Sequence, residues 1–493
     1  MSEPLKVLMV TSEITPFAKA GGLADMVGSL SKALAGRGHD VRVMLPRYYF
    51  IDPIASGLSK HEAPLGVPLG TGEQWTSVYE CRLPSQTPPV RVYFIEHQDL
   101  YGRDGIYGTR LEPDFPDNVE RFALLCRGAF QLCRMLNWIP DVIHAHDWPA
   151  ALAMVYLRLL ERQAGFERSR GVFTIHNMGY QGVYPKEKMQ VIGLPWEYYL
   201  GAGLEFYDKI NLLKAGILVA DSVSTVSPSY AREILEPKFG FYLDGVVRSR
   251  LEPVVGILNG IDYQEWDPES DPHLPVHFST EDPSAKAELK ARLQAQTGLP
   301  VNADKPLVAM IGRLVEQKGF SVLCDPRQGV LPRVLRELDL QLVILGTGTA
   351  WIEEELARLA WKHSNLKVIL QFNVALSHLI EAAADFFLMP SMYEPCGLNQ
   401  LFSLRYGAVP IATGIGGLTD TVEPYDTLSG RGTGFRIADF SPEAVYQALA
   451  AALAVYRDKP DHLARMRRNG MEKRFSWDRS AAEYEKLYRG GPD

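Results

Sequence analysis

Short apolar runs alternate with helix-patterned stretches along the first half of the chain. The apolar runs occupy residues 6–12, 40–46, 90–96, 141–146, 171–177, 221–227 and 253–260. Stretches with apolar positions at helical spacing occupy residues 26–38, 118–136 and 149–163. Because the runs are short, rich in apolar and β-branched residues and not strictly alternating, they predict strands of a parallel sheet with helices on both faces. The first half therefore predicts a doubly wound α/β domain.

This rhythm stops in the segment 262–300, where prolines and acidic residues precede one helical stretch. Apolar runs then return at residues 306–314, 340–348, 366–372, 384–391 and 408–414. The sequence thus predicts an α/β protein of two Rossmann-like, doubly wound parallel-sheet domains, residues 1–258 and 259–475, facing a deep cleft.

Size and composition agree with two domains and narrow the function. The 493 residues exceed what one hydrophobic core usually organises. A formal charge of -8 argues against a nucleic-acid surface as the main partner. Five cysteines without a C-x-x-C pair favour reduced thiols in a cytoplasm over a disulfide framework or a zinc site. No run of 18 apolar residues indicates a membrane span, and the N-terminus does not read as a signal peptide.

The first candidate site is the segment "FAKAGGLADMVGSL", residues 17–30, which follows the first predicted strand. Gly21 and Gly22 allow a ligand to approach the backbone, the amides that open the next helix favour an anion, and Lys19 adds a charge. A phosphate or a developing oxyanion fits this corner. A tight strand-to-helix turn without a ligand is the alternative interpretation.

Two later strands of the first half also end in polar residues. In "DVIHAHDW", His144 and His146 share one side of a strand and Asp147 ends it, while "GVFTIHNMGYQG" ends in His176. The H-x-H pair has no third ligand at zinc spacing, so no metal is expected. Asp147 is placed to accept hydrogen bonds from a polyhydroxylated ligand, and a buried core histidine is the alternative for His176.

Two strand ends in the second half carry charged residues. Arg313 and Lys318 in "VAMIGRLVEQKGF" could be solvated cations, or could neutralise a diphosphate without a metal. In "PSMYEPCGLNQ", Glu394 lies in a loop and Gly397 with Leu398 opens a helix, an arrangement that suits sugar hydroxyls or an oxocarbenium-like charge. No base is identifiable beside Cys396, which favours a structural or binding role for it.

Eight motifs in this order cover nearly the whole chain and resemble those of bacterial glycogen synthases and plant starch synthases. They are "KAGGLAD", "HAHDW", "TIHN", "TVSPSYA", "GILNGID", "GRLVEQKG", "PSMYEPCGLNQ" and "GGLTDTV". The resemblance implies a glycosyltransferase of the GT-B fold that moves glucose from ADP-glucose to the non-reducing 4-hydroxyl of an α-1,4-glucan with retention. ADP-glucose is then a substrate and no cofactor is implied. Residues 476–493 would form a terminal helix that crosses back to the first domain.

The resemblance also implies roles for individual residues. Lys19 and the amides of Gly21 and Gly22 would contact the donor phosphates, and Asp147 with His176 would contact the glucosyl group. The catalytic residues implied are His176, Arg313, Lys318 and Glu394, of which Arg313 and Lys318 would grip the diphosphate. Glu394 and the backbone of Cys396 and Gly397 would hold glucose hydroxyls, and further donor contacts are implied for Asn259 and Leu398. Phe372 stands where the family stacks adenine, although Asn373 and Val374 replace the acidic neighbour, and "ATGI" replaces a basic version of the segment before "GGL".

On the acceptor side, Tyr101 and Tyr107 lie among glycines in "HQDLYGRDGIYG" and are expected to face a glucose ring.

A closing cleft would expel water, and the departing diphosphate would accept the proton of the incoming hydroxyl. Rival hypotheses are a sugar-nucleotide epimerase, a catalytically silent glucan-binding protein, and a phosphorylase with pyridoxal phosphate.

Overall fold

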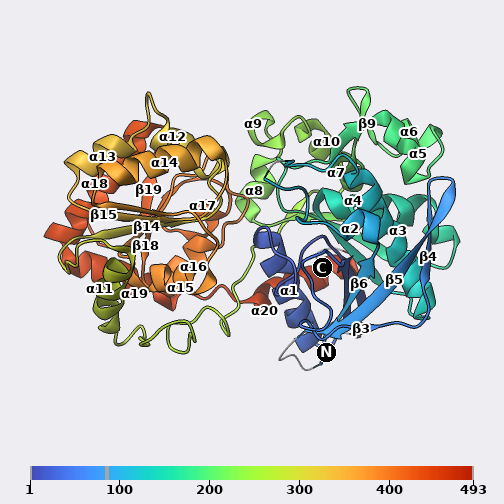
Figure 1. Cartoon of the computed structure of the whole chain (residues 1–493), viewed down its shortest axis with the longest axis horizontal. Coiled ribbons are helices and arrows are strands. Elements are labelled where there is room, and N and C mark those ends of the chain that lie inside the picture. The colour runs from blue at the N-terminus through green and yellow to red at the C-terminus, as the bar shows by residue number, and fades with distance from the viewer. Residues whose placement is uncertain (1–2, 84–87, 111, 491–493) are drawn as a thin grey trace. The chain divides into compact units, whose positions relative to one another are not determined.

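The computed structural model describes residues 3–83, 88–110 and 112–490 (Figure 1). The chain divides into two compact units. Unit 1 comprises Met1–Leu258 with Trp477–Asp493, and unit 2 comprises Asn259–Ser476. The second domain was expected to end at residue 475, and unit 2 ends one residue later, at Ser476. In the described part of the chain, no helix is both long enough and apolar enough to cross a bilayer.

Unit 1 is built on one large mixed sheet with the strand order β13-β12-β8-β7-β1-β2-β6-β5-β3, and β4 pairs with β5. Its strands are β1 (Lys6–Val10), β2 (Asp40–Pro46), β3 (Ser59–Lys60), β4 (Leu65–Leu69), β5 (Gly72–Arg82), β6 (Arg91–Glu96), β7 (Val142–His146), β8 (Arg170–Ile175), β12 (Ser222–Thr225) and β13 (Val255–Gly256). All pairings from β13 to β6 are parallel, and β5 pairs antiparallel with β6, β4 and β3. The apolar runs correctly predicted the parallel part and missed the antiparallel extension.

The helices of unit 1 cover both faces of this sheet. They are α1 (Gly22–Gly36), α2 (Gln98–Tyr101), α3 (Asn118–Met135), α4 (Asp147–Leu159), η1 (Glu161–Gln163), α7 (Leu212–Val219), α8 (Pro228–Glu233), α9 (Pro237–Gly240), α10 (Asp244–Arg248) and α20 (Trp477–Arg489). The crossover from β1 to β2 runs opposite to that from β7 to β8, so right-handed connections place α1 and α4 on opposite faces. A small antiparallel sheet of β9 (Val183–Pro185), β10 (Glu205–Phe206) and β11 (Lys209–Asn211), with η2 (Lys186–Lys188), α5 (Met189–Ile192) and α6 (Glu197–Gly201), forms a further layer.

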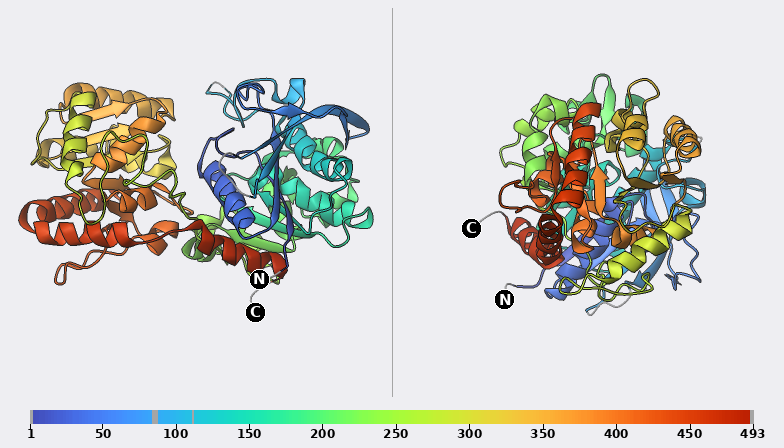
Figure 2. Two further views of the ribbon diagram at one scale, coloured as in Figure 1. Left: turned by 90° about the horizontal axis from the view of Figure 1, so that it is seen from below. Right: turned by 90° about the vertical axis from the view of Figure 1, so that its left-hand side faces the viewer.

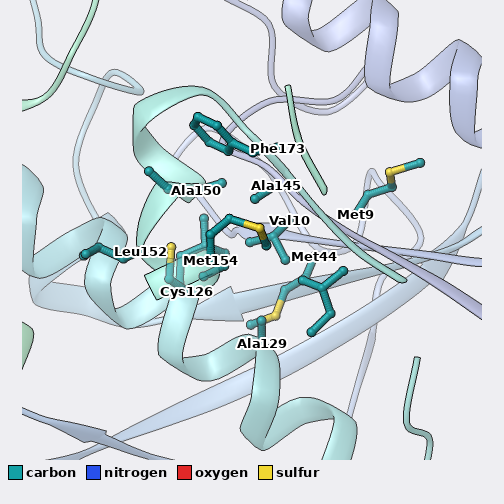
Figure 3. Close-up of a cluster of buried hydrophobic side chains, with 14 of the residues drawn as sticks. Met9, Val10, Met44, Cys126, Ala129, Ala145, Ala150, Leu152, Met154 and Phe173 are labelled. Atoms are coloured by element: carbon teal, nitrogen blue, oxygen red, sulfur yellow. The ribbon is translucent and has the colours of Figure 1, made fainter. Parts of the chain in front are cut away.

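The core of unit 1 explains why its strands are apolar at consecutive positions. Figure 3 shows Met9 and Val10 of β1 with Met44 of β2 and Phe173 of β8, beside side chains from α3 and α4. Consecutive strand residues point to opposite faces, and helices cover both, so each position must be apolar.

The C-terminal helix α20 packs against α1 in unit 1, where both can be followed in Figure 2. Its buried residues recur with helical spacing and are Trp477, Ser480, Ala481, Tyr484, Glu485, Leu487 and Tyr488. Arg37, just after α1, donates to Glu485 through Nε (3.0 Å) and Nη2 (2.7 Å). Chain segments from opposite ends of the sequence thus share one core.

Unit 2 has a parallel six-stranded sheet, in the described residues, with the order β16-β15-β14-β17-β18-β19. Its strands are β14 (Leu307–Ile311), β15 (Gln341–Leu345), β16 (Leu366–Ile369), β17 (Phe386–Met389), β18 (Val409–Thr413) and β19 (Phe435–Ile437). Its helices are α11 (Ala285–Thr297), η3 (Glu316–Lys318), α12 (Phe320–Cys324), α13 (Leu331–Glu337), α14 (Ala350–Lys362), α15 (Val374–Ala383), α16 (Asn399–Arg405), α17 (Gly416–Thr421), α18 (Pro442–Asp458) and α19 (Pro460–Glu472).

Alternate residues of the central strand β14 enter two separate cores. Val308 and Met310 pack in a cluster with α13, α14 and α18, whereas Leu307 and Ala309 pack in a second cluster with α11 and α15. Both faces of the sheet are therefore covered, as the uninterrupted apolar runs predicted.

The proline-rich linker is fixed to unit 2 by a buried polar cluster. The Asp271 carboxylate bonds to His378 Nδ1 (2.7 Å) and accepts from the Tyr406 hydroxyl (2.6 Å). Trp266 stacks on His378 and on Phe402 with ring centroids 3.8 and 3.7 Å apart. These contacts give the segment before α11 a defined path without regular secondary structure.

Candidate active site

Each sheet has one point at which the order of its strands reverses, and the expected site residues follow the strands that meet there. In unit 1, β1 lies between β7 and β2, and in unit 2, β14 lies between β15 and β17. Ligands of open parallel sheets bind at the carboxyl ends of strands at such a switch point. The loops after β1 and β7 and the loops after β14 and β17 are therefore the candidate regions of the two units.

The glycine loop after β1 is held by an acidic side chain, Glu13, that was not among the predicted site residues. Oε2 of the buried Glu13 accepts hydrogen bonds from the amides of Ala20 (2.5 Å) and Gly21 (3.0 Å). Lys19 pairs with Asp25 through a 2.7 Å contact. A Cβ added at Gly21 would meet no atom within 4 Å, so the space beside the loop is open. An anion that binds the Gly21 amide must therefore compete with the Glu13 carboxylate.

The expected acceptor contact of Tyr101 is wrong. Its ring is fully buried, and its hydroxyl donates to the carbonyl of Arg121 at 2.5 Å, so no face is available to a sugar. The glycine-rich setting suggested exposure, but α2 packs this side chain into the core. Tyr107 is half-buried, and its hydroxyl donates to Glu13 Oε1 at 2.5 Å and contacts Ser12 Oγ at 2.8 Å. Tyr107 thus belongs to the support of the glycine loop.

Asp147 ends β7 and connects it to the end of β8. It adopts a left-handed backbone conformation with φ of 55° at the start of α4. Its Oδ1 accepts from the amides of His176 (2.7 Å) and Asn177 (3.4 Å). Burial raises the pKa of the Asp147 carboxyl to about 7, although these two amides oppose the shift.

Three histidines lie beside one another behind this site. The His144 ring nitrogens contact the Tyr488 hydroxyl (2.8 Å) and Thr174 Oγ1 (2.6 Å), and His146 Nδ1 lies 3.2 Å from His176 Nε2. Burial lowers the pKa of His144 and His146 well below 6.5 and that of His176 to about 3. All three rings are therefore neutral at pH 7. Within the described residues, no group of three or more histidine, cysteine or acidic side chains is arranged to hold a metal ion.

Asp147→Asn tests the raised pKa of this carboxyl. Because the folded-state value of about 7 lies above the unfolded value of 3.8, the stability that Asp147 contributes is present at low pH and is lost as pH rises through about 7. Asparagine tolerates the left-handed conformation and keeps Oδ1 as an acceptor. Denaturant titrations at pH 5 and pH 8 give the free energy of unfolding of the variant minus that of wild type. We expect this difference to be about 2 kcal/mol larger at pH 8 than at pH 5. A difference that does not change with pH would contradict the raised pKa.

The structure brings together Lys318 and Glu394, which are 76 residues apart in sequence. Lys318 Nζ lies 2.6 Å from Glu394 Oε2, and Ser391 Oγ donates to the same oxygen at 3.1 Å. The side chains of Lys318 and Glu394 are 26% and 5% exposed. Arg313 and Lys318 also line a cavity of about 40 Å³ at the ends of β14 and β17, with Ser391 and Asn399 as further polar wall residues.

The loop that carries Glu394 is packed too tightly for side chains at two glycines. A Cβ at Gly417 would lie 2.1 Å from the Cys396 carbonyl oxygen, and the Gly417 amide donates to the Glu394 carbonyl at 3.1 Å. Gly397 has φ of 72°, so α16 begins at Asn399 instead of at Gly397, with Leu398 as its N-cap residue. Glycine is therefore favoured at both positions, by the close contact at Gly417 and by the positive φ at Gly397.

Three further expected donor contacts lie in unit 2. Burial raises the pKa of the Cys396 thiol to about 12, which keeps it protonated and poorly nucleophilic at neutral pH. Asn259 is buried, and its Oδ1 has no hydrogen-bond partner among the described residues. Phe372 is 78% exposed and presents an open aromatic face. The roles expected of the Cys396 backbone and of the Asn259 and Phe372 side chains stay predictions.

Comparison with known proteins agrees with this arrangement. Residues 6–249 match the family described as starch synthase catalytic domain, and residues 293–473 match glycosyl transferases group 1. The chain is 48% identical over 484 residues to a glycogen synthase of Treponema denticola, covering 98% of each chain. It is 46% identical over 488 residues to a glycogen synthase of Anaeromyxobacter sp., covering 98% of this chain and 99% of the relative.

Solved structures give the same result. The catalytic domain of starch synthase IV from Arabidopsis thaliana, bound to ADP and acarbose, is 31% identical with a TM-score of 0.90, covering 99% of each chain. Sucrose-phosphate synthase from Thermosynechococcus elongatus shares the fold, with a TM-score of 0.61 and 19% sequence identity. The match covers 99% of this chain and 98% of the other. The predicted fold, of the GT-B type with two parallel-sheet domains, and the predicted glycosyltransferase activity are confirmed.

Proposed function

This chain belongs to the glycogen synthase family, and we propose that it transfers glucose from ADP-glucose to the non-reducing 4-hydroxyl of an α-1,4-glucan with retention of configuration. The observation that carries the proposal is the Lys318–Glu394 pair at the switch point of unit 2, beside Arg313. Fixed cations at that position suit a nucleoside diphosphate, and a carboxylate beside them suits sugar hydroxyls. The family membership makes an epimerase or a silent glucan-binding protein the weaker alternative.

In the proposed reaction the bond from the anomeric carbon to the diphosphate oxygen breaks, and a bond from that carbon to the acceptor O4 forms on the same face. The diphosphate leaves with the bonding electron pair and takes the proton of the acceptor hydroxyl. Lys318 and Arg313 stabilise the negative charge that grows on this leaving group. Glu394 Oε2 is engaged by Lys318 and Ser391, which favours a binding role for it over a covalent nucleophile.

The remaining site residues are proposed to hold the donor. Asp147 Oδ2 and the His176 backbone contact the glucosyl group, and the neutral His176 ring adds no charge there. Lys19 and the Gly22 amide are proposed for the phosphates, together with the Gly21 amide once Glu13 releases it. Asn259, Cys396, Gly397 and Leu398 are proposed for the glucose side. Tyr107 is proposed to act through Glu13 on the glycine loop.

The proposed preference for adenine is supported by one relative and one side chain. The Arabidopsis starch synthase structure holds ADP, and the exposed ring of Phe372 offers a stacking surface. Comparing initial rates with ADP-glucose and UDP-glucose at equal concentration tests this part of the proposal, and equal rates would contradict it. The five cysteines are free, which supports a reducing cytoplasm.

The direct test incubates the protein with glucose-labelled ADP-glucose and glycogen. We expect label in the polymer, release of one ADP per glucose transferred, and labelled glucose in α-1,4 linkage at non-reducing ends. Isomerised nucleotide sugar without labelled polymer would indicate an epimerase. Glycogen binding without ADP release would indicate a silent binding protein.

A further inference from the structure

The C-terminal helix reaches the strand that ends at the candidate site. Tyr488 of α20 places its hydroxyl 2.8 Å from His144 Nδ1, and these residues are 344 positions apart in sequence. Both side chains are buried, with Tyr488 3% and His144 0% exposed. This hydrogen bond joins two buried groups from distant parts of the sequence, and it fixes the orientation of the His144 imidazole.

The available donors and acceptors show which group donates in the hydrogen bond between Tyr488 and His144. His144 is the hydrogen-bond partner of the Tyr488 hydroxyl, so the phenol proton is satisfied only if Tyr488 donates to His144 Nδ1. Burial holds the pKa of Tyr488 well above 10, which keeps that proton in place. His144 Nε2 then carries the hydrogen and donates to Thr174 Oγ1 at 2.6 Å, and Thr174 lies 2.7 Å from Ser224 Oγ. Both His144 ring nitrogens are thereby satisfied.

His144 in turn supports the next histidine of the strand. The rings of His144 and His146 lie 4.1 Å apart between centroids at an angle of 40°. His146 Nδ1 is 3.2 Å from His176 Nε2, and His146 Nε2 is buried without a hydrogen-bond partner among the described residues. A buried imidazole nitrogen without a partner is less costly as a lone pair than as an N–H group. His146 therefore donates from Nδ1, and His176 keeps its own hydrogen on Nδ1.

We propose that Tyr488 is a positioning residue for glucosyl transfer, acting through His144 and its ring contact with His146 to fix the orientation of His176. The inference rests on the proposed function for its kinetic consequence, whereas the tautomer of His176 is independent of it. His176 presents Nδ1–H as a donor away from His146, which suits a hydroxyl oxygen of the transferred sugar. A segment that follows unit 2 in sequence thereby sets the geometry of a residue in unit 1.

The test uses Tyr488→Phe in the full-length protein, with Tyr484→Phe as the matched control. Both tyrosines are buried on α20 and pack on the His144 ring, at 5.6 Å and 5.4 Å between centroids. Of these two tyrosines, Tyr488 is the one that forms a hydrogen bond with His144. The His144 Nδ1 atom contacts the Tyr488 hydroxyl, and its Nε2 atom contacts Thr174 Oγ1. Loss of one buried hydroxyl is the same change in both variants.

For Tyr488→Phe we expect the turnover number to fall about 10-fold while the KM for donor stays within about twofold, and Tyr484→Phe to keep wild-type turnover. In protein labelled with ¹⁵N in its histidine rings, wild-type His176 should show the Nδ1–H tautomer. The Tyr488→Phe spectrum should show a shifted or mixed His176 signal.

Unchanged turnover and an unchanged His176 signal in Tyr488→Phe would overturn the inference, as would an Nε2–H tautomer in wild type. Equal loss of turnover in both variants, in step with a lower melting temperature, would show a merely structural role and would also overturn it. If wild type transfers no glucose, the proposed function fails, and the effect of Tyr488→Phe on the His176 signal still tests the coupling.

Discussion

Replacing Lys318 by alanine should lower the turnover number by about 10²- to 10³-fold, with a much smaller change in the KM for donor. The reason is that charge accumulates on the diphosphate as its bond to glucose breaks, so a fixed cation stabilises the transition state more than the bound donor. Lys318 is held for this role by Glu394 at 2.6 Å, beside a cavity that Arg313 also lines. Steady-state kinetics with ADP-glucose and glycogen measure both parameters.

Lys473→Ala is the matched control for this variant. Lys473 pairs with Glu423 at 2.7 Å, and its side chain is 26% exposed, the same fraction as that of Lys318. Lys473 is the C-cap residue of α19 and belongs to neither of the loops that follow β14 and β17. The control should keep turnover within about twofold and lose less than about 1 kcal/mol of stability. Comparable losses in both variants would contradict a leaving-group role for Lys318.

Glu394→Gln should lower turnover by about 10²-fold because its carboxylate holds Lys318 and is placed for sugar hydroxyls. The amide has nearly the same shape and keeps an acceptor for Lys318 or Ser391, so folding should be retained. The matched control is Glu355→Gln on α14, where the glutamate side chain is 10% exposed and accepts from Arg358 Nε at 2.7 Å. Wild-type turnover in Glu394→Gln, measured at saturating donor and glucan, would refute the assignment.

The double variant Lys318→Ala/Glu394→Gln separates stability from chemistry. Lys318→Ala alone leaves the buried Glu394 carboxylate without its cation, which lowers the free energy of unfolding. Removing the charge at position 394 as well should restore much of that stability, because no unpaired buried charge remains. Turnover should stay as low as in the lysine variant. Recovery of turnover together with stability would mean that Lys318 matters only for folding.

The sequence predicts those parts of the fold that depend on a covered parallel sheet. The run at 40–46 coincides with β2, and the run at 141–146 contains β7, because burial on both faces requires apolar residues at consecutive positions. The short antiparallel strands β9, β10 and β11 were missed. They have two or three residues each, too few to display a period.

The candidate site could be predicted where residue type and strand end coincide, as for Lys318 and Glu394. Glu13 was missed because a single acid after an apolar run does not reveal that the following loop folds back onto it. Tyr101 was placed wrongly because glycines around an aromatic residue do not report whether a short helix buries it. The contact of Tyr488 with His144 joins distant parts of the chain, and no local pattern encodes such a contact.

Two fixed cations, Lys318 and Arg313, are proposed to stabilise the departing diphosphate without a metal ion. The most direct test is the turnover number of wild type and Lys318→Ala in excess chelator and again after addition of Mg²⁺. We expect the wild-type turnover number to be the same in both conditions, and we expect Mg²⁺ not to rescue the variant. Loss of wild-type turnover in chelator with recovery on Mg²⁺ would contradict the proposal.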